Sequence, residues 1–345
     1  MTTPSDPTGR YARQTVFPGI GPEGQSRLRD SRVVLVGCGA LGTVIANVLA
    51  RAGVGFLRIV DRDYVELSNL QRQVLFDEED AREGAPKAVA AVAKLQRINS
   101  EVAYEPVVSD VGPDNAERLV RDVDLILDGA DNLEVRYVLN DVATKLGKPW
   151  VYAAAVASYG VVMPIVPGET PCLRCLFPDP PAAASVDTCD TAGVLGPMPG
   201  IIANLAAAEA IKLLVGAREQ LSRGLLWIDC WYNTVQRTPI EEPVPDCPTC
   251  QQGRFDFLDR LGAAPAATLC GRDAVQVRPT SPSELDLPAL AARLQPIGEV
   301  RQNAHLVRLV APPHELTIFR DGRAIVKGTS DPATARGLYA RYVGT

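Results

Sequence analysis

A glycine-rich turn between an apolar strand and a helix constrains the fold of this chain more than any other feature. Residues 33–36 are continuously apolar, as in the buried strands of parallel sheets. They lead into Gly37-Cys-Gly-Ala-Leu-Gly42, and a helical pattern follows from about residue 41 to 52. Glycines at this spacing let the backbone approach a phosphate at a helix N-terminus, where the dipole favours anions. The turn therefore predicts a nucleotide-binding α/β domain.

The next 200 or so residues continue the alternation of strands and helices, which predicts a Rossmann-like, doubly wound and mostly parallel sheet. The Pro-, Ala- and Gly-rich segment 177–199 has no periodicity, so we expect a mobile crossover loop there. We place this domain at residues 1–252. Its predicted strands are 33–37, 56–60, 123–128, 149–154, 161–166 and 225–230, and its predicted helices are 41–52, 87–97, 116–120 and 200–215.

Composition changes after Cys250, and residues 254–345 predict a separate small α+β module. The turn Asp321-Gly322 lies between two apolar runs and predicts a hairpin. The predicted strands are 274–277, 306–310, 315–319 and 324–327, with helices at 287–294 and 332–342.

Charge and composition exclude several classes of function. The net charge is −6 and no basic domain or tail is present, so nucleic acid is an unlikely partner. The N-terminus lacks a signal-peptide core and the longest apolar run, 151–166, is too short to span a bilayer, so we expect a cytoplasmic protein. Both histidines of the chain, His305 and His314, lie near its C-terminus, so the first 300 residues contain none. Chemistry at the glycine turn must therefore use Lys, Arg, Asp or Cys.

A second polar cluster decides which nucleotide the turn binds. Asp61 ends the second strand and suits ribose hydroxyls, which on its own leaves an NAD-dependent oxidoreductase open. An Asn/Gln/Arg run then follows, with Lys87 at a helix start and Asp131-Asn132 after another strand. Each could be a solvated surface group, but together they suit a triphosphate with Mg²⁺. The candidate nucleotide-binding residues are Gly37, Gly39, Ala40, Gly42, Asp61, Asp63, Ser68, Asn69, Gln71, Arg72, Lys87, Asp131 and Asn132.

Four of the eight cysteines form two C-x₂-C pairs, Cys172 with Cys175 and Cys247 with Cys250. This spacing predicts a Zn²⁺ site, although redox dithiols or disulfides share it. An intracellular setting disfavours disulfides. Because four thiolates leave no open coordination position, we expect a structural site rather than a catalytic one.

A set of motifs carries a resemblance to a known family over residues 8–252. The motifs are Tyr11-Ala-Arg-Gln14, the glycine turn, Asp61, Ser68-Asn-Leu-Gln-Arg-Gln73, Lys87, Asp131-Asn132, Arg136, Asn140, the two cysteine pairs and Cys189-Asp-Thr-Ala-Gly193. The chain resembles the ThiF/MoeB family, the bacterial relatives of ubiquitin-activating enzymes, and within it the ThiF members most. Its Ala40 replaces a third glycine of many relatives, which is tolerable where the backbone is not at positive φ.

The resemblance implies a function and roles for particular residues. Family members adenylate the C-terminal glycine carboxylate of a small ubiquitin-like sulfur carrier of the ThiS or MoaD type, which ends in Gly-Gly. A terminal carboxylate has a pKa of about 3.5 and needs no general base, which agrees with the absence of histidine from the first 300 residues. By the resemblance Asp61, Asn69, Arg72 and Lys87 hold ATP, Asp131 holds Mg²⁺, and Arg13 reaches the ATP of the partner in a homodimer.

The resemblance leaves the role of Cys189 open. In some members the matching loop cysteine bonds covalently to the carrier, whereas Asp187 and Asp190 beside it should raise its pKa and lower its reactivity. The implied catalytic residues are Arg13, Arg72, Lys87, Asp131 and Cys189.

The C-terminal module lacks the persulfide loop of a rhodanese and resembles an extension on some bacterial thiazole-biosynthesis members. We therefore expect sulfur to come from a cysteine desulfurase or a separate rhodanese. Carrier docking, dimer support and simple stabilisation all remain open for the module. Thiamin thiazole synthesis is favoured, with molybdopterin synthesis and tRNA thiolation also compatible.

Three other functions compete with carrier adenylation. A tRNA threonylcarbamoyladenosine dehydratase would use the same fold, but the acidic balance and both C-x₂-C pairs count against it. An NAD oxidoreductase would leave residues 69–72 without a purpose. A non-catalytic subunit of a split activating enzyme would be expected to lose the charged residues of the ATP site, and all are present here.

Overall fold

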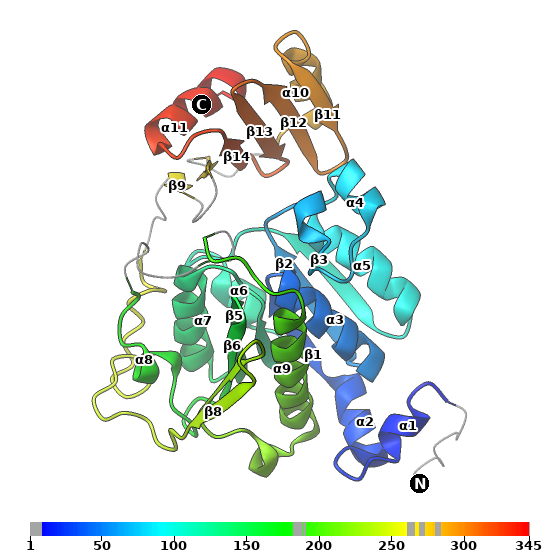
Figure 1. Cartoon of the computed structure of the whole chain (residues 1–345), viewed down its shortest axis with the longest axis vertical. Helices are drawn as coiled ribbons and strands as arrows, with labels where there is room; N and C mark the ends of the chain where they lie inside the picture. Colours follow the sequence, from blue (N-terminus) through cyan, green and yellow to red (C-terminus); the bar gives the residue numbers. More distant parts are fainter. Residues whose placement is uncertain are drawn as a thin grey trace. The chain divides into compact units, whose positions relative to one another are not determined.

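The computed structural model describes residues 9–181, 188, 191–260, 266–268, 273–279 and 284–344. These residues form two compact units, each of which is described separately (Figure 1). The first contains the described residues from 9 to 181 and from 193 to 260, and the second contains residues 188, 191 and 192 and all the described residues from 266 to 344. The domain limits 1–252 and 254–345 stay a prediction.

The first unit is built on one eight-stranded sheet in the order β3-β2-β1-β4-β5-β6-β7-β8. The strands from β3 to β5 are parallel, and β6, β7 and β8 add antiparallel to that edge. This confirms the predicted doubly wound, mostly parallel sheet. The strands are β1 (Arg32–Val36), β2 (Phe56–Asp61), β3 (Ala103–Val108), β4 (Leu125–Asp128), β5 (Trp150–Val156), β6 (Tyr159–Ile165), β7 (Leu225–Asp229) and β8 (Thr234–Thr238).

Alternating residues of the sheet belong to two hydrophobic cores, one on each face. In β1, Val33 and Leu35 lie in the core that contains residues of α3 (Ala40–Ala52), α5 (Lys87–Ile98) and α9 (Pro197–Val215). Val34 and Val36 lie in the second core, with residues of α6 (Ala116–Val120) and α7 (Leu133–Leu146). Burial on both faces explains why these strands read as continuous apolar runs.

Several elements of the first unit were not expected from the sequence. The helix α7 begins at a cap, because the Asn132 side chain accepts a hydrogen bond from the Glu134 N–H, and it ends at Gly147 in the left-handed conformation. The helix α9 starts at Pro197, within the range expected to be loop, since proline suits a first helical position. The other unexpected elements are α1 (Ala12–Thr15), α2 (Gly21–Asp30), η1 (Leu67–Asn69), α4 (Glu78–Glu83), β3, α8 (Leu173–Leu176), η3 (Arg218–Gln220) and β8.

Among the described residues one helix, α9, is long and apolar enough to cross a membrane. Half of the 18-residue apolar stretch of α9 is buried, and the helix packs against α3, β5 and β6. The apolar run 151–166 instead forms most of the hairpin of β5 and β6. The packing of α9 is that of a core helix.

The second unit is the predicted α+β module. Its sheet has the order β11-β12-β13-β14-β10-β9, and every pairing in it is antiparallel. Two helices, capped by Asp286 and Asp331, contribute Leu290 and Ala335 to the core of the unit. The elements are β9 (Ala266–Thr268), β10 (Ala274–Val277), α10 (Leu287–Leu294), β11 (Glu299–Gln302), β12 (Leu306–Ala311), β13 (His314–Phe319), β14 (Ala324–Lys327) and α11 (Pro332–Tyr342); β9 and β11 were not expected.

Two glycine-to-alanine changes should have opposite effects on stability. A Cβ at Gly42 would lie 2.1 Å from the Gly37 carbonyl oxygen, so the backbone of the turn must shift. We expect Gly42→Ala to lower the free energy of unfolding by about 1–3 kcal/mol. At Gly200, inside α9, an added Cβ meets nothing within 4 Å, and Gly200→Ala should stabilise by about 0.5–1 kcal/mol. Urea unfolding of both variants measures this, and a neutral Gly42→Ala would contradict the tight packing of the turn.

Candidate functional site

The glycine turn packs so closely against the neighbouring loop that a side chain is excluded at its first residue, Gly37. Gly37 has a φ of 89°, and a Cβ there would lie 2.4 Å from the carbonyl oxygen of Gly129, which follows β4. Gly39 is the N-cap of α3, whose first amide groups have no partner within the helix. Ala40 begins α3 and is not at positive φ, so its methyl group is accommodated. The turn can therefore present backbone N–H groups to an anion.

Asp61 joins the end of β2 to the glycine turn. Its carboxylate accepts hydrogen bonds from the backbone N–H of Cys38 (2.6 Å) and of Asp63 (2.7 Å). Burial raises the pKa of Asp61, while the nearby Lys87 ammonium and these N–H donors oppose the rise. A carboxylate has about four acceptor positions, so Asp61 retains capacity for a ribose hydroxyl.

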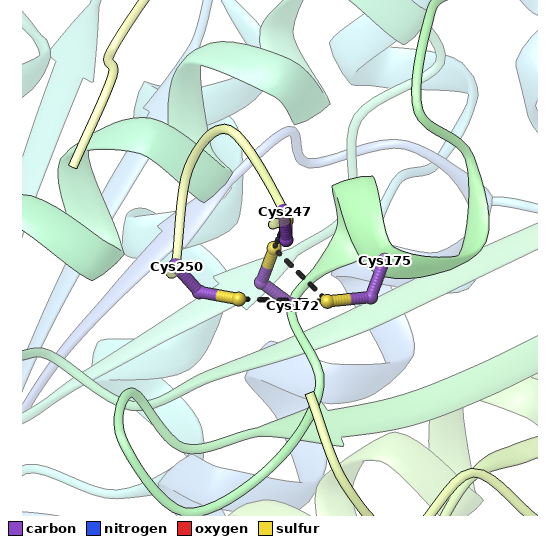
Figure 2. A group of neighbouring side chains, drawn as sticks. All are labelled: Cys172, Cys175, Cys247 and Cys250. Atoms are coloured by element: carbon purple, nitrogen blue, oxygen red, sulfur yellow. Dashed lines mark hydrogen bonds between the residues drawn. The ribbon is translucent and has the colours of Figure 1, made fainter. Parts of the chain in front are cut away.

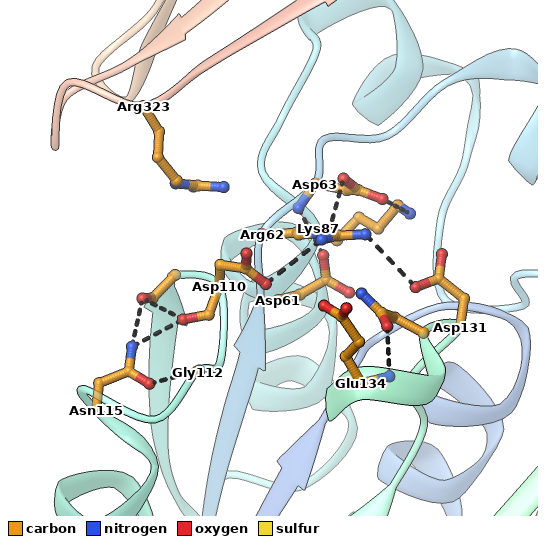
Figure 3. Close-up of polar contacts among 12 residues, drawn as sticks. Asp61, Arg62, Asp63, Lys87, Asp110, Gly112, Asn115, Asp131, Glu134 and Arg323 are labelled. Atoms are coloured by element: carbon orange, nitrogen blue, oxygen red, sulfur yellow. Dashed lines mark hydrogen bonds and ion pairs between the residues drawn. The ribbon is translucent and has the colours of Figure 1, made fainter. Parts of the chain in front are cut away.

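Lys87 and Asp63 form a pair next to Asp61 (Figure 3). The Lys87 Nζ lies 3.2 Å from Asp63 Oδ2, and the Lys87 backbone N–H donates to the Asp63 carbonyl oxygen at 2.9 Å. The Lys87 side chain is buried at the start of α5. Asp63, predicted as a nucleotide ligand, thus holds a predicted phosphate-binding lysine.

The segment 68–72 uses part of its polar groups for its own structure. Asn69 is buried, and its Oδ1 accepts the Glu66 N–H at 3.0 Å as part of a capping box around η1. Arg72 donates to the Ser68 carbonyl oxygen at 2.9 Å. Gln71 lies against Gly196, where an added Cβ would be 3.3 Å from Gln71 Oε1. The Asn69 amide oxygen therefore helps to fix the shape of the segment that carries Arg72.

A buried ion pair shapes the loop after β4. Arg136 Nε lies 3.0 Å from Asp128 Oδ2, and its Nη2 donates to the carbonyl oxygens of Ala130 (2.7 Å) and Ala153 (3.2 Å). Asp128 is completely buried, and burial raises its pKa against the opposing effect of Arg136. Sequence motifs included Arg136 but gave it no role; the structure shows that it holds the loop leading to Asp131.

Asp131 and Asn132 have different environments. The Asp131 side chain is 66% exposed, with Oδ1 3.8 Å from Arg62 Nη2. Asn132 caps α7, its Oδ1 accepting the Glu134 N–H at 2.8 Å. Asp131 is thus available to a ligand at this edge of the sheet, whereas the Asn132 side chain has a structural partner.

One predicted residue, Arg13, lies away from the glycine turn of its own chain. The Tyr11 ring lies against Gly53, at the C-terminal end of α3, where a Cβ would be 2.5 Å from it. The glycine turn is at the other end of this 13-residue helix, about 20 Å away. Arg13, two residues after Tyr11, therefore does not serve the turn of its own chain. Cys189 lies outside the described residues, as does Cys270.

The four C-x₂-C cysteines come together in one cluster (Figure 2). Their Sγ atoms all lie within 4.8 Å of one another, with Cys172 to Cys247 at 3.6 Å and Cys175 to Cys250 at 3.5 Å. Four sulfur atoms around Zn²⁺ at about 2.3 Å would have this spacing. None of the six described cysteines is in a disulfide. The cluster could hold a zinc ion.

Two polar residues of α7 tie the cysteine cluster to the rest of the unit. Asn140 Oδ1 accepts the Leu173 N–H at 2.8 Å, next to Cys172. Asp141 accepts the Thr249 hydroxyl at 3.1 Å and the Phe257 N–H at 2.8 Å. Asp141 was missed from the sequence, although a polar pair inside an apolar helical face was a signal. Helix α7 therefore contacts the cluster and begins beside Asp131.

Together the sheet, the glycine turn and the polar edge define a nucleotide-binding α/β protein with a four-cysteine cluster. The ThiF family model matches residues 11–249. The chain belongs to the ThiF family.

Similar proteins cover nearly the whole chain. It is 44% identical over 339 residues to the sulfur carrier protein ThiS adenylyltransferase of Bacillus subtilis, an alignment that covers 98% of this chain and 100% of that protein. It is 42% identical over 263 residues to the SAMP-activating enzyme E1 of Haloferax volcanii, covering 76% of this chain and 96% of the relative. The extent of the first match shows that the C-terminal module is shared with the Bacillus protein.

A solved structure shares the fold. Escherichia coli MccB superimposes with a TM-score of 0.64 at 23% identity, covering 72% of this chain and 74% of MccB. At this identity the likeness shows the architecture alone. The resemblance to the ThiF/MoeB family and the predicted fold class are confirmed.

Removal of zinc should destabilise the first unit. We expect purified protein to contain one zinc ion per chain and a strong chelator to lower its Tm by several degrees, because the cluster joins two segments distant in sequence. Cys250→Ser should lose the metal. Cys230→Ser, outside the cluster, should keep it. Elemental analysis with differential scanning calorimetry measures both, and a metal-free protein of unchanged Tm would contradict a zinc site.

Proposed function

We propose that the protein adenylates the C-terminal carboxylate of a small ubiquitin-like sulfur-carrier protein that ends in Gly-Gly. The observation that carries the proposal is the 44% identity, over 98% of this chain, to a protein named sulfur carrier protein ThiS adenylyltransferase. Matches to the SAMP-activating enzyme E1 and to MOCS3, an adenylyltransferase and sulfurtransferase of Sus scrofa, support the same reaction class. This chain matches 52% of MOCS3.

The reaction fits the charges at the edge of the sheet. The carrier carboxylate is ionised at neutral pH and attacks the α-phosphorus of ATP. A bond from carboxylate oxygen to phosphorus forms, the bond to the bridging oxygen breaks, and pyrophosphate leaves with those electrons. The main barrier is repulsion between anions. Lys87 and Arg72 would offset it, with the amides of the glycine turn at the phosphates and Asp61 at the ribose.

Mg²⁺ fits the donors that the edge offers. An exposed carboxylate is a hard oxygen ligand of the kind that Mg²⁺ prefers, and Asp131 provides one. When bound with ATP, the ion would neutralise phosphate charge. Asp131 would hold it, kept in place by the loop that Arg136 braces.

The remaining partners follow from the same reaction. Because Arg13 lies at the far end of α3 from its own glycine turn, we place it at the ATP of the second subunit of a homodimer. Cys189 remains a candidate for a covalent bond to the carrier. A cysteine desulfurase or a separate rhodanese would supply sulfur in the cytoplasm. The Bacillus relative favours thiamin thiazole synthesis, and the MOCS3 match keeps molybdopterin synthesis in view.

Exchange of labelled pyrophosphate into ATP tests the proposal. We expect exchange only with Mg²⁺ and a Gly-Gly carrier present. Asp131→Asn should reduce it by about a hundredfold or more, since a charge that stabilises the transition state is lost, with Tm unchanged. Asp30→Asn, an exposed aspartate at the end of α2, is the matched control and should retain full exchange.

Two results would contradict the proposal. ATP binding without exchange for any Gly-Gly carrier would exclude carrier adenylation and favour a tRNA substrate. Full exchange in the Asp131→Asn variant would remove Asp131 from its role.

A further inference from the structure

Arg62 lies at a meeting point of carboxylates from three strand ends (Figure 3). Its Nη1 is 3.5 Å from Oδ1 of Asp110, which follows β3, and its Nη2 is 3.8 Å from Oδ1 of Asp131, which follows β4. Its Nε is 4.0 Å from Oδ1 of Asp63. Asp110 and Asp131 are thus linked by one guanidinium that extends from the end of β2.

The charges around Arg62 show why the edge needs this residue. The carboxylates of Asp61, Asp63, Asp110, Asp131 and Glu134 gather at this edge (Figure 3). The Lys87 ammonium lies 3.2 Å from the Asp63 carboxylate. Although burial opposes the charged form, Asp110, Asp63 and Asp131 raise the pKa of Arg62 above its ordinary value. Arg62 is therefore a permanent positive charge in an acidic site proposed to receive a triphosphate.

The three contacts of Arg62 differ in how easily they can change. Asp110 and Asp63 have side chains that are mostly covered, whereas the Asp131 side chain is 66% exposed. Asp131 can therefore turn away from Arg62 while the guanidinium stays with Asp110. A divalent cation and a guanidinium would compete for the same Asp131 oxygen atoms.

We propose that Arg62 is a positioning residue whose guanidinium pairs with Asp131 in the absence of Mg²⁺ and supplies the positive charge that the metal supplies when it is bound. Without metal Arg62 holds Asp131 toward the edge of the sheet and offsets part of the negative charge of the carboxylates. When the metal nucleotide binds, Asp131 exchanges Arg62 for Mg²⁺, and Arg62 remains with Asp110. This inference rests on the proposed role of Asp131, and it makes Arg62 the group that keeps the empty site from binding divalent cations.

Binding of Mn²⁺ alone, followed by electron paramagnetic resonance without nucleotide or carrier, tests the proposal. Arg62→Gln and Arg62→Met each remove the competing charge, and we expect Mn²⁺ to bind about tenfold more tightly to both. Arg62→Lys, which keeps the charge, should bind as weakly as the parent protein. Addition of Asp131→Asn to either removal variant should abolish the gain.

Arg58, which lies on β2 four residues before Arg62, provides the matched control. It is a buried arginine that pairs with Asp122 (2.7 Å) and Glu105 (2.9 Å), away from Asp131. Arg58→Gln should lower stability without tightening Mn²⁺ binding. Unchanged Mn²⁺ affinity in the Arg62 variants, an equal gain in Arg58→Gln, or a gain that survives Asp131→Asn would each overturn the proposal. Because neither carrier nor exchange is involved, failure here is separate from failure of carrier adenylation.

Discussion

The close backbone contact among three glycines is the constraint on which the proposed site depends. A Cβ added at Gly37 would lie 2.4 Å from the Gly129 carbonyl oxygen, and one added at Gly129 would lie 2.4 Å from the Gly37 carbonyl oxygen. A Cβ at Gly42 would lie 2.1 Å from the Gly37 carbonyl oxygen. The loops after β1 and β4 therefore touch. These strands are neighbours at the point where the strand order reverses, which is where open α/β sheets bind ligands.

Electrostatic contacts give this packed framework its chemistry. The Asp128–Arg136 pair fixes the loop after β4, and Asp63 holds Lys87 beside the ribose-binding candidate Asp61. Helix α7 then connects this edge to the four-cysteine cluster through Asn140 and Asp141. A metal bound at the cluster would thus stabilise the helix whose first turn follows Asp131.

Much of the fold could be predicted because strands buried on both faces of a sheet have continuous apolar sequences. Strands such as β1 and β4 are continuous apolar runs, and the glycine turn has a fixed spacing. Helix α7 was missed, since its cap Asn132 was interpreted as a ligand and buried polar residues interrupt its apolar pattern. The edge strand β8 has mostly exposed residues and so lacks an apolar signal.

The sequence predicted many of the residues of the candidate site, but not which hydrogen bonds and ion pairs they make. The sequence indicated that Asn69 belongs to the site, yet whether its amide binds ATP or caps η1 depends on a local turn. Arg62 resembles any charged residue after a strand. Its contacts with Asp110 and Asp131 exist only because β2 lies beside β3 and two strands from β4.

The origin of the oxygen atoms in the AMP product tests carrier adenylation most directly. A Gly-Gly carrier with a heavy oxygen isotope in its C-terminal carboxylate would be incubated with the protein, ATP and Mg²⁺, and the acyl group trapped with hydroxylamine. If carboxylate attacks the α-phosphorus, one labelled oxygen must leave with AMP, and mass spectrometry should find it there. Unlabelled AMP, or cleavage of ATP to ADP, would contradict the account.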